Sequence, residues 1–402
     1  MKTRKSNKYL SFLLIPLLTC ACSSEQLDSV SDASLTGDEP VVEAIDVSYN
    51  DLTRAQNLTL SSFSLSVFNK KTSALLADKI YFVKGTSGYT SNQSWRMANA
   101  NMKAISVSPS MDDCDVVLDA DNQYFDYVIP DVPEGTMFKI GANLDFTKKS
   151  TGNKLSLKFV NALSLFNVRV RNELKVERDE GGDTKEYSVK IFVKGVTIHN
   201  LYSKGRFTFT GDINGTWTPI DNQYSNYSQD LDEAVELSTS SFTDILNGPY
   251  VLLPQAPQDN AWAPAAQDDD TEEYAAANGI AKANADHKVY IELRCSMIAD
   301  FGEGPVYLWG GENTYTPIYF PYIKKYCPKS WNTINKQGVY NMKLIKGEAL
   351  DANGRPIKPQ AQSNGESFEN AVFISVAPTD DNDEDYVDDW NDPEDNTVEF
   401  SL

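Results

Sequence analysis

Residues 289–297 read VYIELRCSM, and this stretch has the clearest strand pattern in the chain. Its apolar residues alternate with mostly polar ones, and successive side chains of a β-strand point to opposite faces. The period of two therefore predicts a strand with one buried face. Similar runs recur along the chain, separated by Gly, Asn, Asp and Pro at intervals of roughly 8–20 residues. Many short alternating strands with such turns predict an all-β chain built from β-sandwiches.

The other strand-like segments extend over most of the chain. They lie at residues 41–49, 58–67, 80–83, 124–129, 137–140, 155–159, 168–170, 187–193, 339–344, 372–376 and 398–402. A polar, turn-rich segment at residues 147–153 interrupts them and predicts a boundary between two sandwich domains, 41–150 and 151–378. Residues 271–285 differ, since six alanines follow the acidic triplet Asp268 to Asp270, a plausible N-cap. We expect a short helical insertion there, weakened by Gly279.

The composition excludes several classes of function. The 402 residues hold 57 acidic and 36 basic side chains, for a formal charge of −21. This balance argues against nucleic acid and anionic membrane surfaces as partners, since both require a cationic face. Only two histidines occur, His199 and His287, and we expect structural roles for both. No catalytic or phosphate-binding motif is present in the sequence, so we predict a protein that is not an enzyme and needs no cofactor or metal.

The N-terminus has the pattern of an export signal. Four cations in residues 1–8 precede an apolar run at residues 9–18, which is too short for a stable membrane span. Cys22 follows the small residue Ala21, as at the lipidation site of a bacterial lipoprotein. Cys20 is the alternative lipidation site, and plain secretion with both cysteines removed is a further one. We predict a signal peptide over residues 1–21, with lipid on Cys22 anchoring the chain to the membrane.

Residues 22–40 are rich in Ser and Asp and are predicted to form a tether. The first strand, residues 41–49, follows it. Arg54 is the first Lys or Arg after Cys22, and it lies in a polar, turn-like stretch. We therefore predict proteolytic processing between Arg54 and Ala55, with an ordinary loop arginine as the alternative.

The C-terminal segment, residues 379–402, combines an acidic linker and a terminal strand. Ten Asp and Glu residues fall in 380–395 without a cation. Residues 381–385 match the start of a calcium loop, but Tyr386 stands where the turn requires Gly, so a solvated linker is favoured. Beyond it, Val398, Phe400 and Leu402 alternate with polar residues. This strand either pairs with another subunit as a donor or closes its own sheet.

Two further sets of residues leave alternatives open. Cys114, Cys295 and Cys327 form an odd set for an exported chain, and three buried thiols are slightly favoured over one disulfide between Cys295 and Cys327. Trp262 and Trp309 lie in loop-like sequence and are the best candidates for exposed, sugar-stacking rings. Packing in the core is the more common role for each tryptophan.

Several ordered motifs resemble the fimbrillin family of Bacteroides-type pilus subunits, in its Mfa-like branch. The motifs are FDYVIP at 125–130, KLSLKFVNALS at 154–164, YVLLPQ at 250–255, GVYNMKL at 338–344, the strand at 372–376 and the pair Asp389 and Trp390. Each motif is weak alone, and the ordered set is more specific. Asn161 departs from the family, whose members often have His before Ala-Leu.

The resemblance implies two tandem transthyretin-like β-sandwich domains and export to the outer membrane and cell surface. It also implies that an arginine-specific protease removes the first strand, and that a strand of another subunit then fills the groove. In this chain, a cut after Arg54 would detach residues 41–49 together with the lipid on Cys22. Loss of a strand exposes unpaired backbone groups, so an added strand is needed for stability.

The resulting prediction is a structural or adhesive pilus subunit that joins other subunits by strand addition. A host or bacterial surface ligand, protein or glycan, is a further possible partner. The alternatives are a membrane-retained fimbrial anchor and a glycan-binding surface lipoprotein. Additional surface at residues 258–287 and 309–331 favours a tip or adhesive role over a stalk role.

Overall fold

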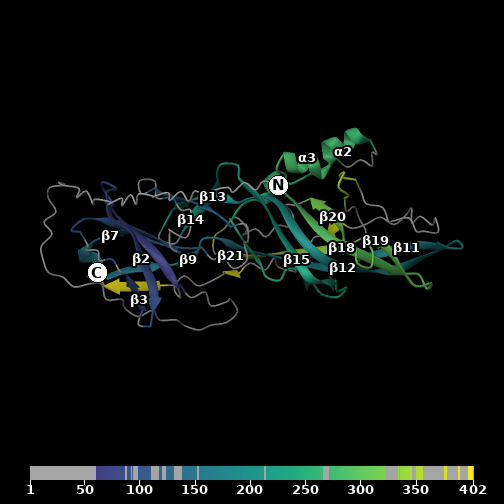
Figure 1. The fold of residues 1–402 in the computed structure, drawn as a ribbon, viewed down its shortest axis with the longest axis horizontal. Helices are drawn as coiled ribbons and strands as arrows, with labels where there is room; N and C mark the ends of the chain where they lie inside the picture. Colours follow the sequence, from purple (N-terminus) through teal and green to yellow (C-terminus); the bar gives the residue numbers. More distant parts are fainter. Residues whose placement is uncertain are drawn as a thin grey trace, which may run out of the picture. The chain divides into compact units, whose positions relative to one another are not determined.

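The computed structural model describes residues 60–86, 88–91, 93, 98–109, 117–119, 124–130, 138–151, 154–211, 214–265, 271–321, 334, 336–345, 350–355, 375–377, 388–389 and 397–401. These residues form an all-β fold of mainly antiparallel sheets (Figure 1), as the alternation predicts. The segment 290–300, which contains most of the quoted stretch, is strand β18, Tyr290–Asp300. Within the described part of the chain, no helix is both long and apolar enough to cross a membrane.

A six-stranded sheet organises the N-terminal part, in the order β3-β2-β1-β4-β7-β9. Its strands are β1 Ser62–Asn69, β2 Leu75–Gly85, β3 Gly88–Ser91, β4 Met102–Ser108, β7 Lys139–Phe146 and β9 Val160–Asn161. Hydrophobic cores lie on both faces. Phe63 and Leu65 of β1 belong to one cluster, and Val107 of β4 and Ile140 of β7 belong to the other. In a strand of a sheet that is buried on both faces, every residue is buried, and this is the case for β4.

Two smaller sheets supply the remaining strands of the N-terminal part. One is the pair β24-β8, formed by β8 Lys154–Lys158 and β24 Thr397–Ser401. The other has the order β14-β13-β6-β5, with β5 Val117–Asp119, β6 Tyr124–Val128, β13 Lys204–Phe209 and β14 Gly215–Pro219. Strands from beyond residue 150 thus pair with strands before it, as β13 does with β6 and β9 with β7. Residues Glu39–Leu402 form one compact unit, and the boundary near residue 150 stays a prediction.

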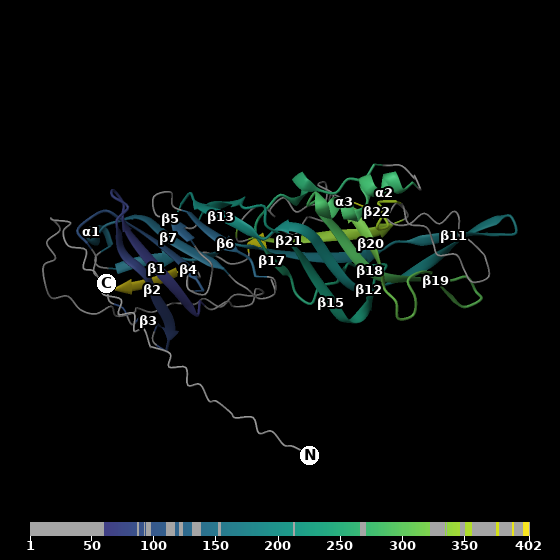
Figure 2. The same cartoon turned by 45° about the horizontal axis from the view of Figure 1, so that its top comes forward.

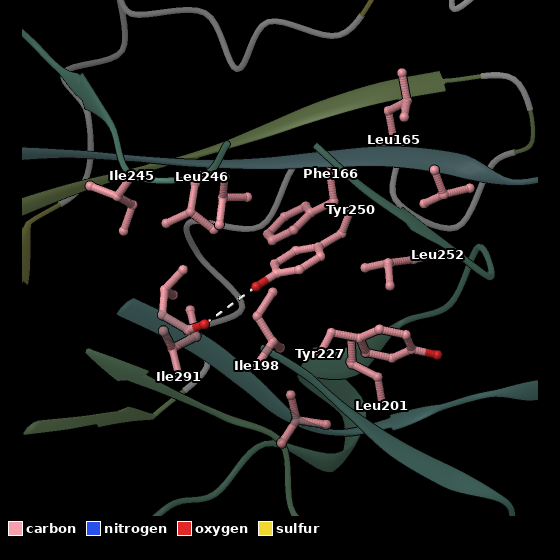
Figure 3. Packing of buried hydrophobic residues seen from close by; sticks show 14 of the residues in the cluster. Leu165, Phe166, Ile198, Leu201, Tyr227, Ile245, Leu246, Tyr250, Leu252 and Ile291 are labelled. Carbon is pink, nitrogen blue, oxygen red and sulfur yellow. Dashed lines mark hydrogen bonds between the residues drawn. The ribbon is translucent and has the colours of Figure 1, made fainter. Parts of the chain in front are cut away.

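Two further sheets face each other in the C-terminal part. In the first, β10 Ser164–Asn172 pairs in parallel with β21 Lys336–Ile345; β16 Thr243–Asp244, β17 Tyr250–Leu252, β22 Ser375–Ala377 and β23 Asp388–Asp389 flank them. The second has β18 and β12 Asp183–Tyr202 at its centre, with β11 Lys175–Glu180, β15 Tyr224–Glu236, β19 Pro305–Trp309 and β20 Thr316–Pro321. The hydroxyl of Tyr250 spans the core and donates to the carbonyl of Val196 at 3.3 Å (Figure 3).

The long strand β12 shows how the alternation is kept and shifted. Val189, Ile191 and Val193 are buried, as the sequence predicts. At Gly195 the register with β18 shifts by a β-bulge, and the buried set continues at Val196 and Ile198. A bulge inserts one residue into a strand and so exchanges its two faces.

The helical insertion is present as two short helices, α2 Glu272–Asn278 and α3 Ile280–Ala285. Thr271 caps α2 by accepting a hydrogen bond from the backbone N–H of Tyr274; the acidic triplet before it lies outside the described residues. Gly279 separates the helices. A side chain there would meet the carbonyl oxygens of Ala275 at 2.7 Å and Ala352 at 2.9 Å, so the break requires glycine.

Candidate strand-exchange site

The site is the edge where the C-terminal strand adds to the N-terminal part of the fold. β24 runs antiparallel to β8, with Val398 opposite Leu157 and Phe400 opposite Leu155. In Figures 1 and 2, β24 is the yellow arrow near the mark for the C-terminus. Some 240 residues of sequence separate the two strands, so this pairing depends on the fold and on no local turn.

β8 supplies the apolar surface of the site. Leu155 and Leu157 are fully buried, as is Phe159 just beyond the strand. The ring of Phe159 lies 5.3 Å from that of Phe63 on β1, and Phe63 stacks on Phe82 of β2 at 4.8 Å. The strand that pairs with β8 therefore borders the core, and its apolar positions stand opposite buried leucines.

Gly141 fixes how closely β8 approaches the large sheet. A side chain at this position of β7 would lie 2.5 Å from the carbonyl oxygen of Lys158 and 3.3 Å from the ring of Phe159. Only glycine leaves room for this contact. β8 is thus held tightly on the sheet side, while β24 supplies its partner in the described part of the chain.

A buried lysine lies near the same region. Lys139, the first residue of β7, is opposite Asn161 of β9 and Ser108 of β4, and it is only 3 % exposed. Burial lowers the pKa of its ammonium to about 8, because desolvation disfavours the charged form. The sequence analysis did not identify Lys139 as a buried charge. Its position next to Ile140 in a predicted strand was the signal available, and that position indicates a strand without showing that both faces of the strand are buried.

The processing residues predicted from the sequence lie outside the described residues. These are Cys20, Cys22, Arg54 and Ala55, together with the tether and the first strand. Of the predicted donor residues, Val398 and Phe400 lie in β24, whereas Leu402 is outside the described residues. β24 pairs within its own chain, which is one of the two alternatives for this strand; its role as a donor stays a prediction.

The other polar candidates have structural surroundings. His199 on β12 lies with its Nε2 3.0 Å from Oε2 of Glu292 and stacks on the ring of Tyr290 at 4.2 Å. His287 stacks on Tyr224 at 4.2 Å. Among the described residues, no group of three or more metal-ligating side chains occurs. Of the acidic tract, the described residues are Asp388 and Asp389, which form β23 and pair with β21.

The structure shows the surroundings of Cys295, Trp262 and Trp309. Cys295 is a free, buried thiol, and burial raises its pKa; Cys114 and Cys327 lie outside the described residues. Of the two roles considered for Trp262, packing in the core is the one observed. Trp262 is only 4 % exposed, and its indole N–H donates to the carbonyl of Asn278 beneath the helical insertion. Trp309 is half-buried, and its indole N–H donates to the carbonyl of Thr316 at 3.0 Å.

Sequence reasoning missed the hairpin of β13 and β14, which joins β6. Its rings form an aromatic cluster with that strand: Phe207 stacks on Phe125 at 5.2 Å, and Trp217 meets Phe125 edge-on at 5.7 Å. The indole of Trp217 also donates to the carbonyl of Ala162, at 2.6 Å. The alternation of Phe207 and Phe209 signals a strand but gives no indication of its partner.

Comparison with known proteins gives structural likeness only. No family model matches the chain, and no curated protein matches it. Among solved structures, it is similar to a fimbrial protein from Bacteroides vulgatus, at 13% identity and a TM-score of 0.48, over 76% of this chain and 95% of that one. It is also similar to a candidate cell adhesion protein from Parabacteroides distasonis, at 10% identity and a TM-score of 0.41, over 80% and 91%. A candidate cell adhesion protein from Bacteroides eggerthii has 12% identity and a TM-score of 0.35, over 82% and 90%.

Proposed function

We propose that the chain is a structural or adhesive subunit of a cell-surface fimbria. In this proposal it reaches the outer membrane as a lipoprotein through Cys22 and is cut between Arg54 and Ala55. It then joins its neighbours by strand exchange, with residues 397–402 as the donor strand. Its partners are other subunits and, for an adhesive role, a protein or glycan on another surface.

One observation carries the proposal: β8 accepts a strand from the far end of the sequence. The pairing uses backbone hydrogen bonds and an alternating register against buried Leu155 and Leu157. Strand addition of this kind takes its affinity from the main chain and its specificity from alternate side chains. A copy of β24 from a second subunit offers the same backbone and the same register, so the edge at β8 suits addition in trans as well as in cis.

A second line of support comes from the sequence around the predicted cut. The strand at residues 41–49 and the lipid site both precede Arg54, and no other Lys or Arg lies between Cys22 and Arg54. A single cleavage would therefore release the membrane anchor and remove a strand together. This coupling suits a subunit that must leave the membrane when it polymerises.

The test begins with N-terminal sequencing and intact mass of the protein taken from its native cell surface. We expect an N-terminus at Ala55 and ladders of polymer that resist detergent at low temperature. Arg54→Ala should keep the lipidated form and abolish polymer, whereas Lys282→Ala, at an exposed position of α3, should leave both unchanged. A lipidated Cys22 in the assembled fibre would instead indicate a membrane-retained anchor.

A donor-defective variant tests the strand itself. Val398→Asp with Phe400→Asp puts charges at the two positions opposite the buried leucines, so its tail should not add to β8. Because its own β8 is intact, it should still accept a strand and cap wild-type chains. Polymerisation of this variant on its own would refute the donor role.

A further inference from the structure

Two arginines lie on the same face of β10, turned away from the hydrophobic core. Val168 and Val170 of this strand are buried in the core. Arg169 and Arg171 alternate with them and therefore point to the opposite face, where residues two apart are separated by about 6.6 Å. Their side chains are 38 % and 21 % exposed. The sheet thus presents two guanidinium groups at one place.

The ring of Phe242 packs against both guanidinium groups. The guanidinium carbon of Arg171 lies 5.0 Å from the centroid of this ring, and that of Arg169 lies 5.9 Å from it. Phe242 directly precedes β16, and the hydroxyl of Ser238 orders the loop before it by accepting hydrogen bonds from two backbone N–H groups. Cation–π contacts at partly exposed sites are weak, so the ring can be displaced at a low cost in free energy.

With the ring in this position, each arginine has a donor without an acceptor. The Nε atoms of Arg169 and Arg171 are buried, and neither makes a hydrogen bond in the part of the chain that the structure describes. Oδ1 of Asp244 lies 3.5 Å from Nε of Arg169, which is beyond hydrogen-bonding distance, and accepts from the amide of Asn167 at 2.9 Å. Arg171 contacts Glu173 through Nη2. Buried donors without acceptors cost free energy, so a ligand that supplies acceptors recovers it.

The donors suit a carboxylate. A guanidinium presents its N–H groups as a planar fork that matches the two oxygens of a carboxylate, and hydrogen bonds between charged groups are the strong ones. Asp244 and Glu173 are 60 % and 39 % exposed, and exposed ion pairs contribute little, so both compete weakly for the arginines. Lys343 holds the register position opposite Arg171 on β21 and adds a third cationic residue to this part of the sheet.

The surroundings favour a sugar as the carrier of that carboxylate. Ser240 and Ser241, in the loop before Phe242, are exposed, and their hydroxyl groups can both donate to and accept from the hydroxyl groups of a sugar. The net charge of −21 disfavours an extended polyanion, because the chain as a whole repels it. A single acidic sugar is therefore favoured over an acidic polymer or peptide.

We propose that Arg169 and Arg171 bind the carboxylate of a terminal acidic sugar, a sialic or a uronic acid, after the ring of Phe242 moves aside. The carboxylate accepts hydrogen bonds from the Nε atoms, and the serine-rich loop contacts the sugar hydroxyls. The site names a ligand class for the adhesive role and in that respect rests on the proposed function. Binding itself needs neither cleavage at Arg54 nor exchange of β24.

Titration of the full chain with oligosaccharides, followed by saturation-transfer NMR, tests the proposal. Sialyllactose and a glucuronate-terminated disaccharide carry the two kinds of acidic sugar, and we expect at least one of them to bind. The methyl ester of the bound ligand keeps the sugar and loses the charge, so it should bind at least about ten-fold more weakly. Absence of binding by both acidic ligands would overturn the proposal, as would equal binding of the methyl ester. Equal or tighter binding of a short polyglutamate peptide would instead indicate an acidic peptide as the partner.

Substitutions of the arginines test the site itself. Arg169→Lys and Arg171→Lys keep the charge and lose the planar fork, so each should weaken binding about ten-fold. Arg294→Gln is the matched control, because Arg294 is also partly exposed and contacts carboxylates, but on another sheet; it should change binding less than about two-fold. Unchanged binding in both lysine variants would refute the assignment.

A double variant changes binding in the opposite direction. Asp244→Asn with Glu173→Gln removes the two carboxylates that compete for the arginines, so it should tighten binding about three-fold. Misfolding does not produce such a gain, so this variant decides the question when an arginine variant fails to fold. Unchanged or weakened binding in the folded double variant would contradict the proposal.

The outcome is separable from the proposed function. Sugar binding by a chain that forms no detergent-resistant polymer would support this site and refute strand exchange. Polymer formed by a chain that binds neither acidic sugar would refute this site and leave strand exchange standing.

Discussion

Pairing of the C-terminal strand with β8 can be measured by a double-mutant cycle on Leu157 and Val398. Leu157 is fully buried, and Leu→Ala changes at such sites cost about 2–5 kcal/mol, through lost transfer free energy and the cavity left behind. We expect about 3 kcal/mol for Leu157→Ala. Val398 is its register partner, and directly opposite pairs in antiparallel strands contribute about 0.2–1 kcal/mol. The coupling between the two substitutions should therefore be about 0.5–1 kcal/mol.

The assay is urea unfolding of the monomeric chain, because a shift in midpoint at constant slope reports stability alone. The control cycle uses Thr397→Ala and Lys158→Ala, the neighbouring register pair, in which Lys158 is exposed. We expect coupling near zero in this control. A coupling of zero between Leu157 and Val398 would mean that β24 does not lie on β8 in solution, and the reasoning that bases strand exchange on this edge would fail.

Three further predictions concern single residues. Burial lowers the pKa of Lys139 to about 8 in the folded chain, against about 10.4 when unfolded, so the unfolded state binds more protons between these values and stability should rise from pH 7.5 to 9.5. Lys139→Met should flatten this slope in denaturant titrations at different pH values, because the titrating group is removed; an unchanged slope would show that Lys139 is not the cause. Gly141→Ala should destabilise by about 1–3 kcal/mol and speed hydrogen exchange in β8, since its side chain would meet the carbonyl of Lys158; unaltered exchange would contradict the close approach. Trp262→Ala should cost about 3–5 kcal/mol in thermal or urea unfolding and leave binding on a glycan array as it was, because the ring is core; a stable variant that lost glycan binding would reverse this assignment.

The alternation in the sequence predicted individual strands well and their partners poorly. Residues 289–297 were predicted to form a strand, and most of them lie in β18. The prediction succeeded because the burial of one strand face is visible in the alternation of neighbouring residues. The pairing of β6 with β13, some 80 residues later, has no such local record. Neither does the parallel pairing of β10 with β21. Register across sheets is set by tertiary packing, so it could not be derived from one sequence.

Contacts with segments that are distant in sequence explain the smaller differences. The alanine-rich stretch at residues 271–285 predicted one helix, and Gly279 splits it because the chain from Ala352 passes too close for a side chain. Trp262 lies in Pro- and Ala-rich sequence that is typical of an exposed loop, yet the helical insertion covers it. In both cases the deciding neighbour is distant in sequence. Of the candidate site, the terminal strand was predicted, whereas β8 as its edge was not.

The structure of the site also bears on how a strand could both close its own sheet and serve a neighbour. β24 has five residues and pairs with β8 as its one partner in the described part of the chain, whereas β1 is paired on both sides and buried nearly throughout. Short elements with one partner open at low free energy, while central strands open only with global unfolding. A tail held by one short pairing can leave β8 without unfolding the core that receives it. The acceptor would then keep Leu155, Leu157 and Phe159 in place, so an incoming strand would find a formed edge. The coupling energy between Leu157 and Val398 therefore limits the free energy by which this pair keeps β24 on β8 of its own chain. A value well above about 1 kcal/mol would argue that strand exchange needs a further event that releases β24.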